Sequence, residues 1–238
     1  SRQADDIADE GQKEINERIT ELDDYESCLI DALNNIFCNE FWTAVKSTID
    51  VFNLSPENFK NLLNAFRQDI TKSRYKDFTE LLDYCTNSAN PVGRVILELN
   101  NIHDEKLLNY SDNICTALQL TNFWQDVALD FKKNRIYLPT NDLEDFNISE
   151  KDIEQKNCSE NFKKLMKFEI DRTRKLFFEG KKLIEHLPGR LKYQINWTVL
   201  GGEKILDKIE RNAYNSLNLR PRLSKIDYIQ LMIKSLFS

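Results

Sequence analysis

Glycine and proline, the residues that most often interrupt regular structure, are scarce in this sequence. Six glycines and five prolines stand among 238 residues, about 5% against roughly 12% in average usage. A β-sandwich, a β-barrel or a collagen-like chain needs far more turns than that. Long helices joined by a few turns do not, and no stretch shows the alternation typical of a strand. With 41% hydrophobic residues available for a core, the sequence predicts an all-α protein that forms a single domain over residues 1–238.

Charge and cysteine content exclude several functional classes. The formal net charge is −6, whereas a protein that binds a nucleic-acid backbone needs a basic surface. The five cysteines are widely spaced, so neither a disulfide framework nor a zinc site is expected, and a reducing compartment fits. No apolar run approaches the roughly 20 residues of a membrane span. We therefore expect a cytoplasmic protein. Contact with a membrane surface is left open, although no segment stands out as an amphipathic anchor.

Helical patterns run along the whole chain. Ser55 and Pro56 predict the N-cap and first residue of one helix, and Ser224 with Asp227 resembles a capping box at the start of the last. A long loop containing Pro139 is expected over 132–147. The helices are expected over 1–20, 22–37, 41–52, 56–73, 76–88, 92–99, 104–130, 159–186, 190–217 and from 225 onward.

The sharpest chemical feature is a polar line around residue 120. Gln119, Asn122, Asp126 and Asp130 fall within a sector of about 80° on one face of a helix. The rest of this segment is strongly apolar, and burying two carboxylates without partners is costly. A solvated acidic face is the alternative. The apolar surroundings favour carboxylates that face an enclosed cavity.

A second acidic pair stands near the start of the chain. Asp5 and Asp9 are one helical turn apart, and two such carboxylates can hold Mg²⁺, which prefers oxygen ligands and keeps positions for water or phosphate. Acids at a helix start also complement the macrodipole, which is the alternative explanation. Together with Asp126 and Asp130 the pair is a stronger signal, because two acid-bearing helices can clamp metal ions around a diphosphate.

Other segments suggest a lined cavity and an anion contact. Arg135 follows Asp130 by five residues, and its planar fork suits phosphate oxygens, although a loop arginine that caps the helix is the alternative. Tyr84 precedes small residues and Pro91, a pattern typical of a kinked helix lining a cavity, whereas core packing with a satisfied hydroxyl is the more common role of such a tyrosine. The basic segment Arg220-Pro221-Arg222 with Lys225 is expected to form a surface loop, and contact with the diphosphate is the alternative.

Together these segments resemble the squalene/phytoene synthase family of head-to-head isoprenoid enzymes, and within it the hydroxysqualene synthase branch of bacterial hopanoid biosynthesis. The resemblance implies an isoprenoid-synthase helical bundle around a central apolar cavity, with the two acidic motifs on opposite walls binding Mg²⁺ and diphosphate. The family's helix before the first acidic motif is missing from this sequence, so part of the cavity wall is expected to be absent. The matching segments are RQADDIADEG at 2–11, YCTNSANPVG at 84–93, LQLTNFWQDVALD at 118–130 and NRIYLP at 134–139.

The resemblance also implies a role for individual residues. Two departures from relatives that condense two farnesyl diphosphates, Gln125 in place of an arginine and Ser88–Pro91 in place of Val-Ala-Gly, look like the hydroxysqualene branch. The implied catalytic residues are Tyr84, Asp5, Asp9, Asp126 and Asp130; the metal ligands are Asp5, Asp9, Asn122, Asp126 and Asp130; and the substrate contacts are Arg2, Asn90, Gln119, Asn122, Gln125, Arg135 and Tyr137.

The implied reaction is the Mg²⁺-dependent conversion of presqualene diphosphate and water to hydroxysqualene and diphosphate. Tyr84 and Trp124 would stabilise the cation, and Asn90, Gln119 or Gln125 would position the water. The absence of a G-x-G-x-x-G motif fits a reaction without NADPH. The alternatives are condensation of two farnesyl diphosphates to presqualene diphosphate, squalene or dehydrosqualene, and a non-catalytic relative that acts as an assembly or binding protein. The sequence leaves substrate, final product and oligomeric state open.

Overall fold

The computed structural model describes residues 2–9 and 13–236, with the backbone only of Arg2, Asp5, Asp9, Ser235 and Leu236. Within these ranges the regular structure is helical, apart from an isolated bridge between Arg74 and Ile136. The all-α expectation is therefore confirmed. The helices form two compact units, which we treat separately: unit 1 comprises Ser1–Lys72 and Asp83–Leu108, and unit 2 comprises Ser73–Leu82 and Asn109–Ser238. That the chain is a single domain stays a prediction.

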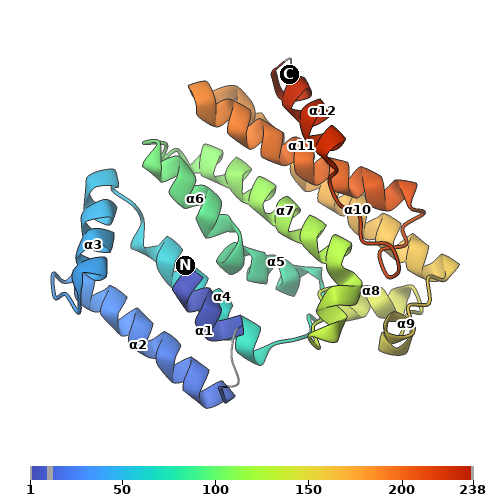
Figure 1. The fold of residues 1–238 in the computed structure, drawn as a ribbon, viewed down its shortest axis with the longest axis horizontal. Helices are drawn as coiled ribbons and strands as arrows, with labels where there is room; N and C mark the ends of the chain where they lie inside the picture. Colours follow the sequence, from blue (N-terminus) through green and yellow to red (C-terminus); the bar gives the residue numbers. More distant parts are fainter. Residues whose placement is uncertain (1, 10–12, 237–238) are drawn as a thin grey trace. The chain divides into compact units, whose positions relative to one another are not determined.

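Unit 1 is held together by helices that pack around leucines and a tryptophan. Helix α1 (Arg2–Asp9) packs against α2 (Ile15–Leu33) and α4 (Pro56–Thr71), as Figure 1 shows. Helix α3 (Glu40–Phe52) packs on α2, and α6 (Asn90–Leu99) packs on α4. Leu22, Leu29, Trp42 and Leu63 are buried in the shared core. The acidic helix α1 is thus fixed through its apolar residues.

Two helix starts in unit 1 differ from expectation. A single helix over 1–20 is wrong: α1 ends at Asp9 and α2 begins at Ile15, after an extended Glu14 whose backbone N–H donates to the Glu17 carboxylate at 3.3 Å. Ser55 does occupy the N-cap of α4, but its side chain makes no capping bond. The buried Glu98 carboxylate instead accepts the Ser55 backbone N–H at 3.0 Å. These caps depend on glutamates outside the usual N-cap preferences.

Unit 2 is built on long helices from the second half of the chain. Helix α10 (Glu160–Gly180) continues into the 3₁₀ helix η1 (Lys181–His186), and both pack against α11 (Gly189–Arg211). Helix α12 (Lys225–Leu236) lies against α11 (Figure 1). Helices α5 (Phe78–Ser88) and α7 (Glu105–Lys132) contribute residues to both units. Trp124, Phe162 and Phe177 are fully buried in unit 2.

The connections in unit 2 confirm most of the expected breaks. The capping box is present, since the Ser224 backbone N–H donates to Asp227 at 2.7 Å and the Asp227 N–H donates to Ser224 Oγ at 3.2 Å. The long loop expected over 132–147 is wrong in part. Pro139 stands at the N-cap of a short helix α8 (Thr140–Asp145), where its missing N–H costs nothing, and α9 (Glu150–Glu154) follows. Within the described residues, each helix is too short or too polar to cross a lipid bilayer.

Candidate functional site

The predicted polar line lies along α7 in unit 2. Asn122 is exposed, and Gln119, Asp126 and Asp130 are half-buried. The helix positions them by burying its other face, which carries Ala117, Leu120, Trp124 and Val127. Residues at intervals of three and four share a face of a helix, so the two carboxylates stand one turn apart on the same side. The line is therefore a local consequence of the sequence once α7 forms.

Asp130 is the most perturbed carboxyl of this line. Burial, and secondly the negative charge of Asp126, raise its pKa from 3.8 to about 7 against the opposing charges of Lys133, Arg135 and Arg220. Two carboxylates with this mutual repulsion form an electrostatic arrangement that a bound cation relieves. Asp130 is thus poised to change its charge near neutral pH.

Arg135 is brought back toward Asp130 by the way α7 ends. Asn134 adopts the left-handed conformation, with φ of 59°, which Asn tolerates better than most residues. The Asn134 N–H donates to the Phe131 carbonyl and the Arg135 N–H donates to the Asp130 carbonyl, each at 2.9 Å. This is the Schellman pattern of helix termination. It places a guanidinium within electrostatic range of the acidic line, as its effect on the Asp130 pKa shows.

The pairing of Arg220 with Asp126 is the contact of this site that the sequence does not predict. The segment is a loop in which Arg220 and Arg222 are exposed, as the sequence predicts. From this loop the guanidinium pairs with both carboxylate oxygens of Asp126, through Nε to Oδ1 and through Nη2 to Oδ2 at 2.8 Å. Gln125 holds the same segment in place, because its Nε2 donates to the Pro221 carbonyl at 2.6 Å. An Arg-Pro-Arg run in an acidic chain was the available signal. Its target stands 94 residues earlier in the sequence, so spacing gave no guide.

Trp124 does not share the side of α7 that carries the acids. Two residues along a helix correspond to about 200°, so the indole points away from both Asn122 and Asp126. Its Nε1 donates to the Thr173 hydroxyl at 2.8 Å and its surface is fully buried. The expectation that Trp124 presents its ring to a substrate cation is therefore wrong. The residue anchors α7 to α10.

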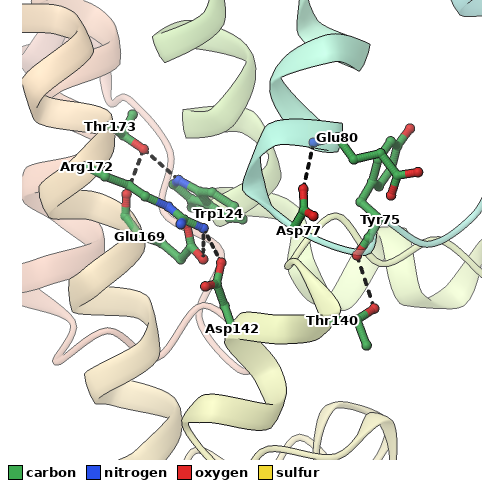
Figure 2. Close-up of polar contacts among 9 residues, drawn as sticks. All are labelled: Tyr75, Asp77, Glu80, Trp124, Thr140, Asp142, Glu169, Arg172 and Thr173. Atoms are coloured by element: carbon green, nitrogen blue, oxygen red, sulfur yellow. Dashed lines mark hydrogen bonds and ion pairs between the residues drawn. The ribbon is translucent and has the colours of Figure 1, made fainter.

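A buried charge network continues from this anchor, as Figure 2 shows. The Arg172 guanidinium donates to both oxygens of Glu169 at 2.5 and 2.6 Å and to Asp142 at 2.5 Å. Its other side lies over the Phe78 ring, 3.6 Å from the centroid. Burial raises the pKa of the fully buried Glu169, and the charge of Arg172 opposes that rise. The network joins α8 and α10 behind the acidic line.

Tyr137, an expected substrate contact, is held in an aromatic stack. Its ring lies 3.7 Å from that of Phe123 and 5.6 Å from that of Tyr75, both nearly parallel to it. Tyr75 is fixed in turn through its carbonyl, which accepts the Thr140 hydroxyl at 3.1 Å (Figure 2). Tyr137 is half-buried, so the stack gives it a defined position next to α7.

The remaining predicted residues lie in unit 1. Tyr84 is buried and its hydroxyl donates to the Asp69 carboxylate at 2.8 Å. Asn90 is buried at the first position of α6, one residue before Pro91, where the sequence predicts a break between two helices. Arg2, Asp5 and Asp9 all lie in α1, but their side chains are outside the part of the chain that the structure describes. Their roles stay predictions.

The oxygen donors of α7 fit a hard divalent cation. Among the described residues no three His, Cys, Asp or Glu side chains gather closely enough to hold a metal ion. A cation on α7 would thus be held by the Asp126 and Asp130 carboxylates with the Asn122 amide oxygen. Mg²⁺ suits such a partial set, because it prefers oxygen ligands and keeps positions for water and phosphate.

Each unit also contains an apolar pocket. In unit 1 a pocket of about 270 Å³ is lined by aromatic and aliphatic side chains of α2, α3, α4 and α6, among them Phe59 and Phe66. In unit 2 a pocket of about 280 Å³ is lined by Leu118 and Asn122 of α7 together with residues of α11 and α12. The second pocket therefore combines apolar walls with one residue of the acidic line.

Comparison with known proteins identifies sequence relatives. A family model described as squalene/phytoene synthase matches residues 1–227. The 15-cis-phytoene synthase of Synechocystis sp. (strain ATCC 27184 / PCC 6803 / Kazusa) is 35% identical over 202 residues, which cover 78% of this chain and 60% of that protein. The chloroplastic phytoene synthase 1 of Solanum lycopersicum is 31% identical over 210 residues, which cover 86% of this chain and 51% of that protein. This chain spans about half the length of most of the plant relatives it matches.

Solved structures with the same architecture were also found. The crystal structure of squalene synthase HpnC from Alicyclobacillus acidocaldarius is 37% identical with a TM-score of 0.85, covering 90% of this chain and 80% of that one. The crystal structure of a dehydrosqualene synthase in complex with a ligand has a TM-score of 0.84 at 21% identity, covering 99% and 82% of the two chains. The second match concerns the fold alone.

Proposed function

This chain belongs to the squalene/phytoene synthase family of head-to-head isoprenoid synthases, and we propose that it is an enzyme acting on an isoprenoid diphosphate. The observation that carries the proposal is the acidic line of α7 with its basic neighbours. Asp126 and Asp130 share one helix face, Arg220 pairs with Asp126, and Arg135 follows the helix end. Neighbouring carboxylates and guanidinium groups suit a metal–diphosphate group, because the carboxylates bind the cation and the guanidinium groups bind the phosphate oxygens.

The acidic and the basic residues of α7 and its neighbours would have different roles in binding. Asp126, Asp130 and Asn122 would hold Mg²⁺, which neutralises the negative charge that develops on a departing diphosphate. Arg135 and Arg220 would contact diphosphate oxygens, for which their planar forks are suited. Gln125 keeps Arg220 near Asp126 through the Pro221 carbonyl. The apolar pocket at Leu118 and Asn122 would accept part of the hydrocarbon chain.

The reaction we propose is conversion of presqualene diphosphate and water to hydroxysqualene and diphosphate. The carbon–oxygen bond to diphosphate breaks, the resulting cyclopropylcarbinyl cation rearranges, and water adds to the allylic cation with loss of one proton. Gln125 and the Ala89–Pro91 segment, which resemble the hydroxysqualene branch, support this reaction. The 37% identity to a protein described as squalene synthase HpnC supports chemistry on squalene precursors in general. The cavity must exclude other water until the rearrangement is complete.

Incubation of the purified chain with presqualene diphosphate and Mg²⁺, without NADPH, tests the proposal. Hydroxysqualene should form, and Asp126→Asn and Asp5→Asn should each abolish its formation. Asp145→Asn, on the exposed end of α8, and Asp6→Asn, one residue from Asp5, are the matched controls and should retain activity. Unreacted substrate with the unaltered protein, or equal rates for the Asp126 variant and its control, would refute it.

Condensation of two farnesyl diphosphates is the second candidate. Relatives described as phytoene synthases, at 31% and 35% identity, favour head-to-head condensation as the type of reaction. Farnesyl diphosphate with Mg²⁺ separates the two reactions by product, because only the condensing enzyme would yield presqualene diphosphate or dehydrosqualene from it. Squalene would form only when NADPH is added as the hydride donor. A non-catalytic binding protein would retain Mg²⁺-dependent binding of a farnesyl thiodiphosphate and turn over neither substrate.

A further inference from the structure

Helix α12 is amphipathic, but it is the apolar face that is exposed. A helix on the surface of a globular protein ordinarily buries its apolar face. Here Asp227 and Leu231 face inward, and the Asp227 carboxylate is bound by Lys208 Nζ at 2.8 Å. The outward side carries Ile226, Ile229 and Ile233, which are 67%, 56% and 50% exposed. Met232 is exposed beside them. Among the described residues of unit 2, the three isoleucines therefore form an apolar stripe that is exposed to solvent.

The stripe continues onto α11 through aromatic residues. Tyr228 and Trp197 meet edge to face with ring centroids 6.2 Å apart. Tyr193, one turn before Trp197, is exposed as well. Tyr and Trp carry a polar tip on an apolar ring and are enriched where one side of a surface is apolar and the other is wet. We call this combined surface, Tyr193, Trp197, Tyr228, Ile226, Ile229, Met232 and Ile233, the α11–α12 face.

The charge around the α11–α12 face is positive although the chain as a whole is negative. No Asp or Glu occurs between Glu185 and Glu203, and after Glu210 the only acid is the buried Asp227. Arg190, Arg222 and Lys225 are exposed in these same segments. Apolar residues with basic neighbours are the composition of surfaces that bind anionic lipid.

We propose that the α11–α12 face docks unit 2 on the surface of an anionic lipid membrane. The isoleucines and Met232 enter the acyl boundary, the aromatic tips lie among the headgroups, and the basic side chains meet lipid phosphates. A second copy of the chain fits less well, because an isologous contact would bring together two faces that carry the same basic residues at their edges.

The face also borders the apolar pocket of unit 2. Trp197 and Tyr228 line that pocket together with Asn122, so its outer rim belongs to the docking surface and its wall includes a residue of the acidic line. Docking would therefore open the pocket toward lipid. An apolar reactant or product could then pass between bilayer and pocket without crossing water.

Vesicle binding followed by tryptophan fluorescence tests the proposal without any use of activity, so its outcome is separate from that of the proposed reaction. Of the three tryptophans, Trp197 is exposed whereas Trp42 and Trp124 are buried. Vesicles of phosphatidylglycerol and bromine-labelled phosphatidylcholine should quench Trp197, and Trp197→Phe should abolish the quenching. The Ile229→Glu, Ile233→Glu double variant should lower the partition coefficient about tenfold or more. Val51→Glu, at a still more exposed apolar position in unit 1, should not.

Three results would overturn the proposal. One is equal binding of the double variant and the Val51→Glu control, with circular dichroism showing both folded. Another is equal binding to vesicles of neutral phosphatidylcholine and to anionic vesicles at low salt. The third is light scattering that shows the unaltered chain to be a dimer that Ile229→Glu dissociates, since the face would then be an interface between two copies.

Discussion

Replacing Asp130 by Asn should stabilise the cation-free protein at pH 8 and leave its stability nearly unchanged at pH 4. Burial and the charge of Asp126 raise the pKa of Asp130 from 3.8 to about 7. Between these two values the folded protein holds a proton that the unfolded chain has lost. The free energy of unfolding therefore falls as the pH rises from about 4 to 7. Asn has no proton to lose, so the variant escapes this decline.

The size of the effect follows from the displacement of the pKa. At about 1.4 kcal/mol for each tenfold change in proton affinity, a rise from 3.8 to about 7 corresponds to at most about 4 kcal/mol. The Asp130 side chain is only half-buried, so water screens part of the interaction. We expect about half of the upper bound, or about 2 kcal/mol in favour of Asp130→Asn at pH 8.

Urea denaturation at pH 4 and pH 8 in the presence of a chelator measures this difference. Asp145→Asn removes one acid from an exposed position of α8 and serves as the control for the change in net charge. With Mg²⁺ and diphosphate present the order should reverse at pH 8, because ligand binding stabilises only a protein that retains the carboxylate. A gain for Asp130→Asn that is equal at both pH values, or no gain at pH 8, would refute the electrostatic reasoning.

Other substitutions test packing and positioning in unit 2. Gly202→Ala should lower the free energy of unfolding by about 1–3 kcal/mol in urea denaturation, because the added Cβ would stand 2.7 Å from a buried phenylalanine of α10. Gly201→Ala is the control, since its Cβ would have its nearest neighbour at 3.8 Å. It should be neutral or stabilising. Arg172→Met should cost about 3–5 kcal/mol by leaving Glu169 buried and unpaired, with a smaller loss at pH 6 than at pH 9; a loss below about 1 kcal/mol would contradict this. Gln125→Ala should raise KM for the diphosphate substrate about fivefold, the loss of one hydrogen bond, with melting temperature and kcat little changed.

The acidic line could be predicted from sequence because it depends on one helix alone. Once α7 forms, the spacing of Asn122, Asp126 and Asp130 fixes their common face. The same rule, applied to Trp124, would have placed its indole on the opposite side, where the structure has it bonded to Thr173. Helix geometry was thus sufficient to place both the acidic line and Trp124. The prediction for Trp124 was wrong because its role was assigned from its residue type and not from its angular position on the helix.

The partner of Asp126 could not be predicted in the same way. Arg220 reaches it across 94 residues, and its position depends on how the segment after α11 returns to α7 and on the bond from Gln125 to Pro221. Glu98, which accepts the backbone N–H of Ser55 from 43 residues away, is a similar case. Polar contacts between distant segments are decided by tertiary packing, for which local spacing carries no information.

Helix α12 shows why a periodic pattern does not by itself say which face is buried. Its sequence has two sides, one with Asp227 and Leu231 and one with three isoleucines, and hydrophobicity alone would turn the isoleucines inward. The inward side is chosen instead by polar bonds. Asp227 closes the capping box with Ser224 and binds Lys208 of α11, and these partners lie where the helix begins and where it packs. Turning α12 over would break both contacts and leave Lys208 without its carboxylate. Since the apolar side is then obliged to face outward, its exposure follows from the cap and the ion pair.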